Sequence, residues 1–305
     1  MDFKFTDSAS EKEEKLKVVF SGSYDDVPEN AVIYIEEGIE EIAENAFRGF
    51  KNLREIHLPK SLKVISAAAF SGCDNLQSVV FSHGLEEILD EAFSSCPALS
   101  VITMPDTVKR VGEGAFEGCA SLSKVRFSES LLMIGASAFA FCFNLRDIVI
   151  PDSCVLVEFN AFASCFSLES VKLSDNMGLI DESVFEGCRS LSVVDLPAKL
   201  SRIGRRAFKG CTSLASLILP VSVREIGLDA FAACTSLSRI AIPKGVRELE
   251  DEDVFGGCDS LTEISFGGSR DGWELLTHGK TLTVERSDLS CFTPTVTILD
   301  LKNEV

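Results

Sequence analysis

The cysteines are the residues of this chain with the most obvious capacity for chemistry. The chain contains eleven of them. Metal sites need thiolates clustered in patterns such as Cys-x-x-Cys, and the sequence contains no such cluster. Nine cysteines instead recur at nearly constant spacing along the chain: Cys73, Cys96, Cys119, Cys142, Cys165, Cys188, Cys211, Cys234 and Cys258.

This spacing predicts a packing role for the cysteines. Side chains that stack in register from one repeat to the next point the same way, which is poor geometry for a disulfide. We therefore expect each cysteine to act as a small buried hydrophobe. Cys154 stands where other repeats have Leu or Val and is also expected in the core. Cys291 lies outside this series, so for it both exposure and pairing remain open.

Neither the histidines nor the glycine-rich stretch forms a catalytic or ligand-binding pattern. Nucleophilic catalysis needs a Cys or Ser beside a His that a third group orients. His57 falls on a predicted strand, away from the cysteines of the return segment, and no third metal ligand accompanies His57 and His83. The glycines of segment 112–118 depart from dinucleotide-binding spacing, and most of them recur as turn positions. The acidic residues 251–253 lack calcium-loop spacing. We predict no catalytic residue, no metal site and no cofactor.

The charge of the chain excludes further classes of ligand. The formal net charge is −18. Nucleic-acid binding depends on Lys and Arg that neutralise phosphates, so we expect no nucleic-acid partner and no attraction to anionic membranes. No stretch approaches the roughly 18 apolar residues that a membrane-spanning helix needs. The N-terminus also lacks the basic start and apolar stretch of a signal peptide.

The elements that position these residues come from an internal repeat. Phenylalanine recurs every 23 residues, usually after Ala. After each repeat Phe, Leu follows by six residues and large apolar residues by nine and eleven, and Cys follows by three in every copy but the first, where Phe50 takes its place. Ten copies in phase indicate a repeat array. The repeat phenylalanines are Phe47, Phe70, Phe93, Phe116, Phe139, Phe162, Phe185, Phe208, Phe231 and, one residue late, Phe255.

The motif Ala-Phe-x-x-Cys-x-x-Leu-x-x-Ile-x-Leu-Pro resembles the BspA-like leucine-rich repeats. The resemblance covers residues 31–266, and the segment from Phe266 to Trp273 is similar to the one that often closes such arrays. It implies a leucine-rich-repeat right-handed superhelix. It also implies a surface or secreted protein of the adhesin or antigen type that binds a host or matrix protein. Because no signal peptide is present, a cytoplasmic location is the alternative.

The pattern within one repeat predicts the architecture. In residues 55–58, Ile56 and Leu58 alternate with Glu55 and His57, which is typical of a half-buried strand. We expect such strands to pair in parallel into a curved sheet on the concave face, with short strands and turns on the return. We assign residues 1–30 to an N-terminal leader and cap, 31–266 to the array and 267–305 to a C-terminal cap. Strands at 281–284 and 295–301 are expected to close the last edge.

The outward positions of the strands form the first candidate binding surface. They lie eight and ten residues after each repeat Phe, and solenoids often bind ligands on this face. Basic residues gather in its middle, with exposed aliphatic side chains beside them, although β-propensity alone would also place aliphatics there. The predicted partner-binding residues are Lys124, Arg126, Arg146, Val149, Lys172, Val193, Asp195 and Ile218.

Breaks in the repeat form the second candidate surface. Repeats between about residues 131 and 180 carry large apolar residues where other copies have small or polar ones. Contiguous exposed apolar surface often marks an interface. The alternative is local repacking of these side chains over the core. The aromatic members of this central patch are Phe141, Phe143, Phe159 and Phe166.

These observations favour a non-enzymatic module that binds a protein partner. The runner-up is a structural or self-associating scaffold, for example a homodimer formed through the central patch. An enzyme is disfavoured because no acid, base and nucleophile converge on one surface.

Overall fold

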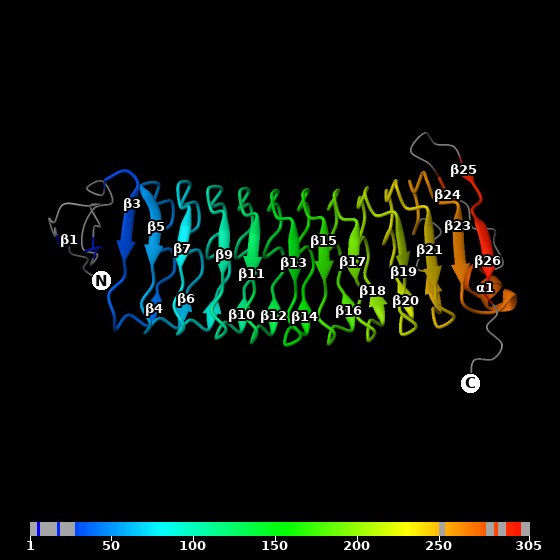
Figure 1. Ribbon diagram of the computed structural model, residues 1–305, viewed down its shortest axis with the longest axis horizontal. Coiled ribbons are helices and arrows are strands. Elements are labelled where there is room, and N and C mark those ends of the chain that lie inside the picture. Colours follow the sequence, from blue (N-terminus) through cyan, green and yellow to red (C-terminus); the bar gives the residue numbers. More distant parts are fainter. Residues whose placement is uncertain are drawn as a thin grey trace. The chain divides into compact units, whose positions relative to one another are not determined.

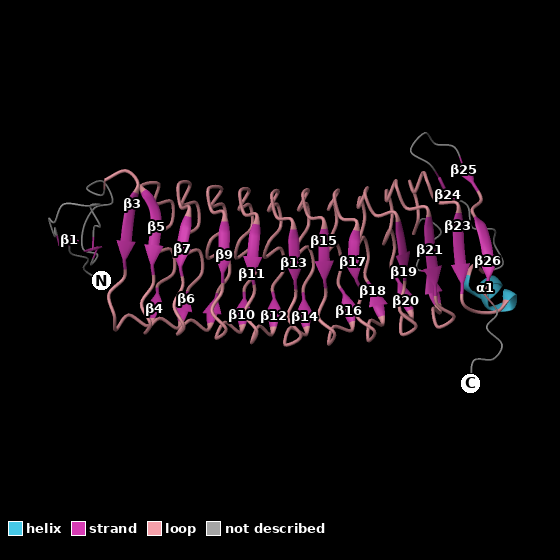
Figure 2. Cartoon of the chain, viewed as in Figure 1, coloured by secondary structure: helices cyan, strands magenta, loops and turns pink. Residues whose placement is uncertain are grey.

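The computed structural model describes residues 5–6, 17–18, 28–249, 254–278, 284–285 and 291–299. The chain divides into two compact units, Met1–Leu145 and Arg146–Val305. In each unit the chain passes repeatedly through a tight turn, a longer strand and a short strand (Figure 1). Strands and turns make up nearly all of the described residues, as the colouring by secondary structure shows (Figure 2). The predicted repeat solenoid of parallel strands is confirmed.

The first unit contains five repeats of this pattern. Its longer strands pair in parallel as β3–β5–β7 and β9–β11, and its short strands pair in parallel in chain order. Near the N-terminus, β1 and β2 pair antiparallel. The bounds are β1 Phe5–Thr6, β2 Lys17–Val18, β3 Ala31–Tyr34, β4 Glu41–Ile42, β5 Leu53–His57, β6 Val64–Ile65, β7 Ser78–Val80, β8 Glu87–Ile88, β9 Val101–Thr103, β10 Arg110–Val111, β11 Lys124–Arg126 and β12 Met133–Ile134.

The second unit continues the same pattern. Its longer strands pair in parallel as β13–β15–β17 and β19–β21–β23–β26, and its short strands as β16–β18–β20–β22. The bounds are β13 Asp147–Val149, β14 Leu156–Val157, β15 Ser170–Lys172, β16 Leu179–Ile180, β17 Val193–Asp195, β18 Arg202–Ile203, β19 Ser216–Ile218, β20 Glu225–Ile226, β21 Arg239–Ile242, β22 Glu248–Leu249, β23 Glu263–Phe266, α1 Arg270–Leu276, β24 Val284–Glu285, β25 Cys291–Phe292 and β26 Thr295–Ile298.

The repeat phenylalanines form a column of stacked rings in the core of each unit. From Phe47 to Phe139 in the first unit, successive ring centroids lie 5.0–5.2 Å apart and the rings are nearly parallel. From Phe162 to Phe255 in the second unit, the centroids lie 5.5–5.9 Å apart. All ten rings are buried. One repeat cannot cover its own ring, so each turn is stabilised by its neighbours.

The cysteines form a second buried column beside the rings. Thiols of this column donate hydrogen bonds of 3.0–3.3 Å to the carbonyl oxygen of the repeat Phe one turn earlier, and the donors are Cys73, Cys96, Cys119, Cys142, Cys188, Cys211, Cys234 and Cys258. Cys154 is buried too. The predicted role as small buried hydrophobes is confirmed, and the thiol also satisfies a buried carbonyl. The side chain of Cys291 lies outside what the structure describes.

Glycine is needed at the turns for two different physical reasons. Gly118 has a φ of 71°, in the left-handed region that glycine adopts without strain. Gly204 has an ordinary φ, but a Cβ atom there would lie 2.7 Å from the carbonyl carbon of Asp181 in the preceding turn. The prediction that the glycines of segment 112–118 are turn residues is confirmed.

The end of the second unit differs in part from expectation. β26 pairs in parallel with β23, as predicted for the region 295–301. The predicted strand at 281–284 falls outside the described residues except for Val284, which begins β24, and β24 pairs antiparallel with β25. The carbonyl of Glu285 in β24 accepts a 2.6 Å hydrogen bond from the N–H of Gly257. This contact continues the hydrogen-bond ladder of the Phe turns, so β24 lies against the last Phe turn.

Candidate binding surfaces

The exposed side of the longer strands, here called the strand face, is clearest in the second unit. Parallel register aligns Asp147, Ser170 and Val193 in one outward row of β13, β15 and β17, and Val149, Lys172 and Asp195 in the other. The residues between the two rows point into the core, since period-two alternation sends neighbours to opposite faces. β19, the longer strand of the next repeat, adds Ile218 (Figure 1).

Aliphatic side chains stand out on this strand face. Val149, Val193 and Ile218 are 61, 59 and 79 % exposed. Lys172 and Asp195 are exposed beside them and occupy register-matched positions on β15 and β17. In the first unit, the corresponding Val80 and Val101 are less exposed, at 42 and 46 %. The second unit therefore offers the more accessible apolar surface.

Two of the predicted basic residues, Arg126 and Arg146, have acidic neighbours that weaken the positive electrostatic potential around them. On the first unit Arg126 forms an ion pair of 2.9 Å with Asp106 and also donates to the carbonyl of Met104. Hydrogen bonds from the Glu129 amide and from Arg126 lower the pKa of the Asp106 carboxyl. On the second unit Arg146 lies 3.9 Å from Glu169. Lys124 and Lys172 are exposed, but they belong to different units.

Two aromatic residues of the predicted central patch project from a turn of the first unit. Phe141 and Phe143 are both exposed, and their rings meet edge to face with centroids 6.3 Å apart. Phe141 has a φ of 61° at a turn position where Gly72 and Gly118 stand in other repeats. A bulky residue in this region costs on the order of 1–2 kcal/mol. The turn requires a left-handed φ at this position in the other repeats too, where Ser95, Ser164 and Ala233 also adopt it without glycine.

The aromatic residues of the second unit behave differently from one another. Phe159 is exposed, as predicted. Phe166 is only half-buried, and the guanidinium of Arg189 lies 4.5 Å from its ring centroid in a cation–π contact. The sequence analysis missed this contact. The sequence did contain a signal for this contact, because Arg189 occupies the same repeat position as Phe166 one repeat later.

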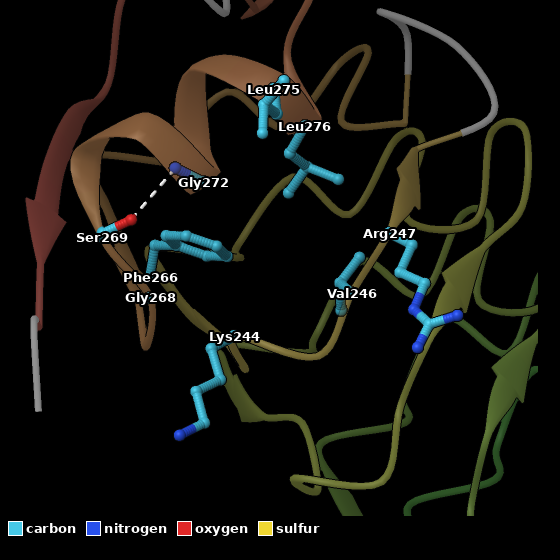
Figure 3. A pocket seen from close by; sticks show the side chains of 9 residues that line it. All are labelled: Lys244, Val246, Arg247, Phe266, Gly268, Ser269, Gly272, Leu275 and Leu276. Atoms are coloured by element: carbon cyan, nitrogen blue, oxygen red, sulfur yellow. Dashed lines mark hydrogen bonds between the residues drawn. The ribbon is translucent and has the colours of Figure 1, made fainter.

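A pocket of about 470 Å³ lies between the turn after β21 and the helix α1. Val246, Phe266 and Leu276 point into it, while Lys244 and Arg247 stand at its rim (Figure 3). Sequence analysis identified the segment containing Trp273 as a closing segment but did not predict a pocket. Pocket formation depends on how α1 folds back over β23, which the repeat pattern does not encode.

Local contacts hold His57, the histidine that the sequence places on a longer strand. His57 bonds the carboxylate of Glu55 and stacks on Tyr34 with centroids 4.2 Å apart. In the part of the chain that the structure describes, no group of three or more His, Cys, Asp or Glu side chains is placed to hold a metal ion. No helix in that same part is long and apolar enough to cross a membrane.

Several solved structures are similar to this chain. A leucine-rich cell surface protein from Faecalibacterium prausnitzii is 25 % identical, with 80 % of this chain and 81 % of that chain covered and a TM-score of 0.44. A leucine-rich repeat protein from Bacteroides ovatus is 22 % identical, with 96 and 98 % covered and a TM-score of 0.44. The pneumococcal vaccine antigen PcpA is 20 % identical, with 100 and 98 % covered and a TM-score of 0.48.

No curated protein matches the chain. The family model described as the BspA type leucine-rich repeat region, in six copies, matches residues 40–165 and 155–271. The two matches overlap and together span most of the sequence. The chain therefore belongs to the BspA-type leucine-rich repeat family.

Proposed function

We propose that this chain is a non-enzymatic module that binds a partner protein on the strand face of its second unit. The observation that carries this proposal is the exposure of Val149, Val193 and Ile218 on a rigid sheet. Exposed apolar patches rimmed by polar residues commonly mark interaction sites. Lys172 and Asp195 add one charge of each sign, which favours a mixed partner surface over a strongly acidic one. On the described longer strands of the second unit, the outward rows hold no aromatic platform for a sugar ring.

A cell-surface location is part of the proposal. It is supported by the family and by the printed description of the Faecalibacterium prausnitzii protein as a cell surface protein. Labelling of intact cells with an antibody against the chain tests it. Signal on intact cells agrees with the proposal, whereas signal only after lysis supports the cytoplasmic alternative.

The binding proposal is tested with a matched pair of valines. Val193 and Val155 are 59 and 60 % exposed, but Val193 lies on the strand face and Val155 lies beside the short strand β14. The purified chain is first screened against an array of extracellular-matrix and cell-surface proteins. A hit is then measured again with Val193→Ser and Val155→Ser.

The exposed fraction sets the expected loss of affinity. Full burial of a Val or Ile side chain contributes about 1.5–3 kcal/mol. A partner that covers the strand face would gain about 1 kcal/mol at Val193, so Val193→Ser should weaken binding about five- to tenfold. Ile218→Ser should weaken it about thirtyfold, because Ile218 is more exposed. Val155→Ser should leave the affinity unchanged. Equal losses for Val193→Ser and Val155→Ser would contradict a site on the strand face.

A second candidate function is self-association through the Phe141 and Phe143 pair, and the exposure of both rings beside each other on one turn favours it. Contiguous exposed aromatic surface is a reason to suspect an interface. Light scattering of the purified chain tests this function. A dimer that Phe143→Ser converts to a monomer agrees with self-association, whereas a monomeric parent chain excludes it.

A further inference from the structure

The pocket beside α1 has the construction of a binding site for a large apolar side chain. Val246, Phe266 and Leu276, which point into it, are nearly fully buried and therefore firmly held. Leu275, on the same side of α1, is 78 % exposed at the mouth. A volume of about 470 Å³ lies within the range of ligand pockets and exceeds the needs of one side chain. An apolar group that enters would lose its contact with water on the sides that face these residues.

The shape of this pocket depends on a glycine. A Cβ atom on residue 268 would lie 2.5 Å from Cε1 of Phe266, so only Gly268 lets the ring keep its place on the pocket wall. The Phe266 ring also packs against Trp273 of α1, and the two ring centroids lie 5.3 Å apart. The wall is thus held by α1 before any ligand arrives, which lowers the ordering cost of binding.

The rim of the pocket is basic in a chain whose net charge is −18. Lys244 and Arg247 are exposed, and neither forms an ion pair with any other residue that the structure describes. They leave the rim in different directions, away from the apolar centre (Figure 3). On α1, helical spacing puts Glu274 on the side opposite Gly272 and Leu276, so its carboxylate faces away from the pocket. Asp271, in the first turn of the helix, lies one turn before Leu275 on the same face.

We propose that this pocket binds an acidic peptide segment in which a large apolar side chain is flanked by carboxylates. The apolar side chain would fill the space between Val246, Phe266 and Leu276. Carboxylates on either side of it would reach Lys244 and Arg247, whose separate directions suit flanking charges better than one central anion. Rim charges of this kind mainly accelerate association and make it sensitive to salt. The pocket shares no residue with the strand face, so this site is independent of the proposed function.

The chain carries its own reporter for this site. Trp273 is the single tryptophan of the sequence and packs against the pocket wall. The probe is a capped synthetic hexapeptide, Asp-Glu-Leu-Phe-Glu-Asp, titrated into the full chain while Trp273 emission is recorded. We expect a saturable change in Trp273 emission as peptide is added. The affinity derived from it should fall markedly when salt is raised from about 0.05 M to about 0.5 M.

Charge-reversal variants locate the binding. Lys244→Glu combined with Arg247→Glu should weaken peptide binding on the order of tenfold or more at low salt. The matched control, Arg54→Glu with Lys60→Glu, makes the same charge change on exposed residues of the first unit and should bind as the parent does. Leu275→Asp, at an exposed position that folding does not need, should also weaken binding. Val193→Ser should have no effect, which separates this site from the strand face.

Several results would overturn the proposal. One is the absence of any emission change up to about 1 mM peptide, well above the range of specific peptide binding. Another is an equal loss of affinity in the two charge-reversal pairs, which would indicate a general charge effect. If a peptide with Ser-Ser in place of Leu-Phe bound equally well, binding would not depend on an apolar side chain, which contradicts the proposal. Binding of decanoate but not of the peptide would assign the pocket to a small fatty acid instead.

Discussion

The cysteine column makes the chain sensitive to alkaline pH. Burial raises the pKa of the thiols of Cys119 and Cys258 to about 12 and that of Cys154 to about 11. Burial also raises the pKa of Cys188, Cys211 and Cys234 well above its ordinary value. In the unfolded chain the same thiols have a pKa of about 8.5–9. Above that pH the unfolded chain loses protons that the folded chain keeps, so folding becomes weaker as pH rises.

The size of the effect follows from proton linkage. For each such thiol, stability is fully present below about pH 9 and falls by about 1.4 kcal/mol per pH unit until the folded pKa is reached. Six thiols together then remove about 8 kcal/mol by pH 10. Folded proteins are stable by only about 5–15 kcal/mol. We therefore expect the urea midpoint of the chain to fall steeply between about pH 9 and 10.

Urea titrations followed by circular dichroism, in reductant at several pH values, measure this directly. Cys188→Ala combined with Cys211→Ala supplies the control. That variant should be less stable than the parent at pH 7.5, because it loses two buried side chains. Its further loss between pH 8 and 10 should be smaller by about 2–3 kcal/mol. An unchanged midpoint across this range, or the same loss in parent and variant, would refute the argument that buried neutral thiols control alkaline stability.

Further predictions concern single contacts of the second unit. Partial burial opposes the charge of Asp229, but hydrogen bonds and charges of Lys209 and Arg206 outweigh it and lower the Asp229 pKa. Asp229→Asn should lower the free energy of unfolding by about 1 kcal/mol near pH 7. In urea titrations, this difference between parent and variant should disappear as pH falls below the unfolded pKa of about 4 and through the lower folded pKa. Gly204→Ala should cost about 1–3 kcal/mol, since its Cβ would meet backbone at 2.7 Å. Gly178→Ala, where a Cβ would meet nothing within 4 Å, should be near neutral; similar costs for both would contradict the close-approach argument. Thiol-specific alkylation with mass spectrometry should leave Cys119 and Cys211 unlabelled in the folded chain and label both in urea.

The architecture was predictable because the same pattern of apolar positions recurs in every repeat. The Phe, Cys and Leu positions each meet their own equivalents one repeat away, so a regular spacing in sequence becomes a regular column in space. The stacked rings from Phe70 to Phe116 and the thiol bond from Cys119 to Phe93 follow from that single rule. The exposure of Val149, Val193 and Ile218 also follows from period-two alternation.

The contacts that define the candidate sites were harder to predict, because they join positions that are not equivalent. Arg126 reaches Asp106, which lies 20 residues earlier in a turn, and the pair removes part of the expected basic surface. Arg189 covers Phe166 from the following repeat. The pocket beside Phe266 depends on the only helix among the described residues, which the repeat does not specify. Side-chain length and direction decide such contacts, and neither is contained in the spacing of the motif.

The aliphatic residues of the strand face have two physical explanations that an isosteric variant can separate. Branched side chains stabilise strands whether or not anything binds them. Threonine has nearly the shape of valine and a comparable preference for strands, but it presents a hydroxyl in place of a methyl group. Val193→Thr should therefore leave the urea midpoint within about 0.5 kcal/mol of the parent chain. If β-propensity is the reason for Val193, partner binding will also be unchanged. If the strand face is an interface, the buried hydroxyl should weaken binding about as much as Val193→Ser does.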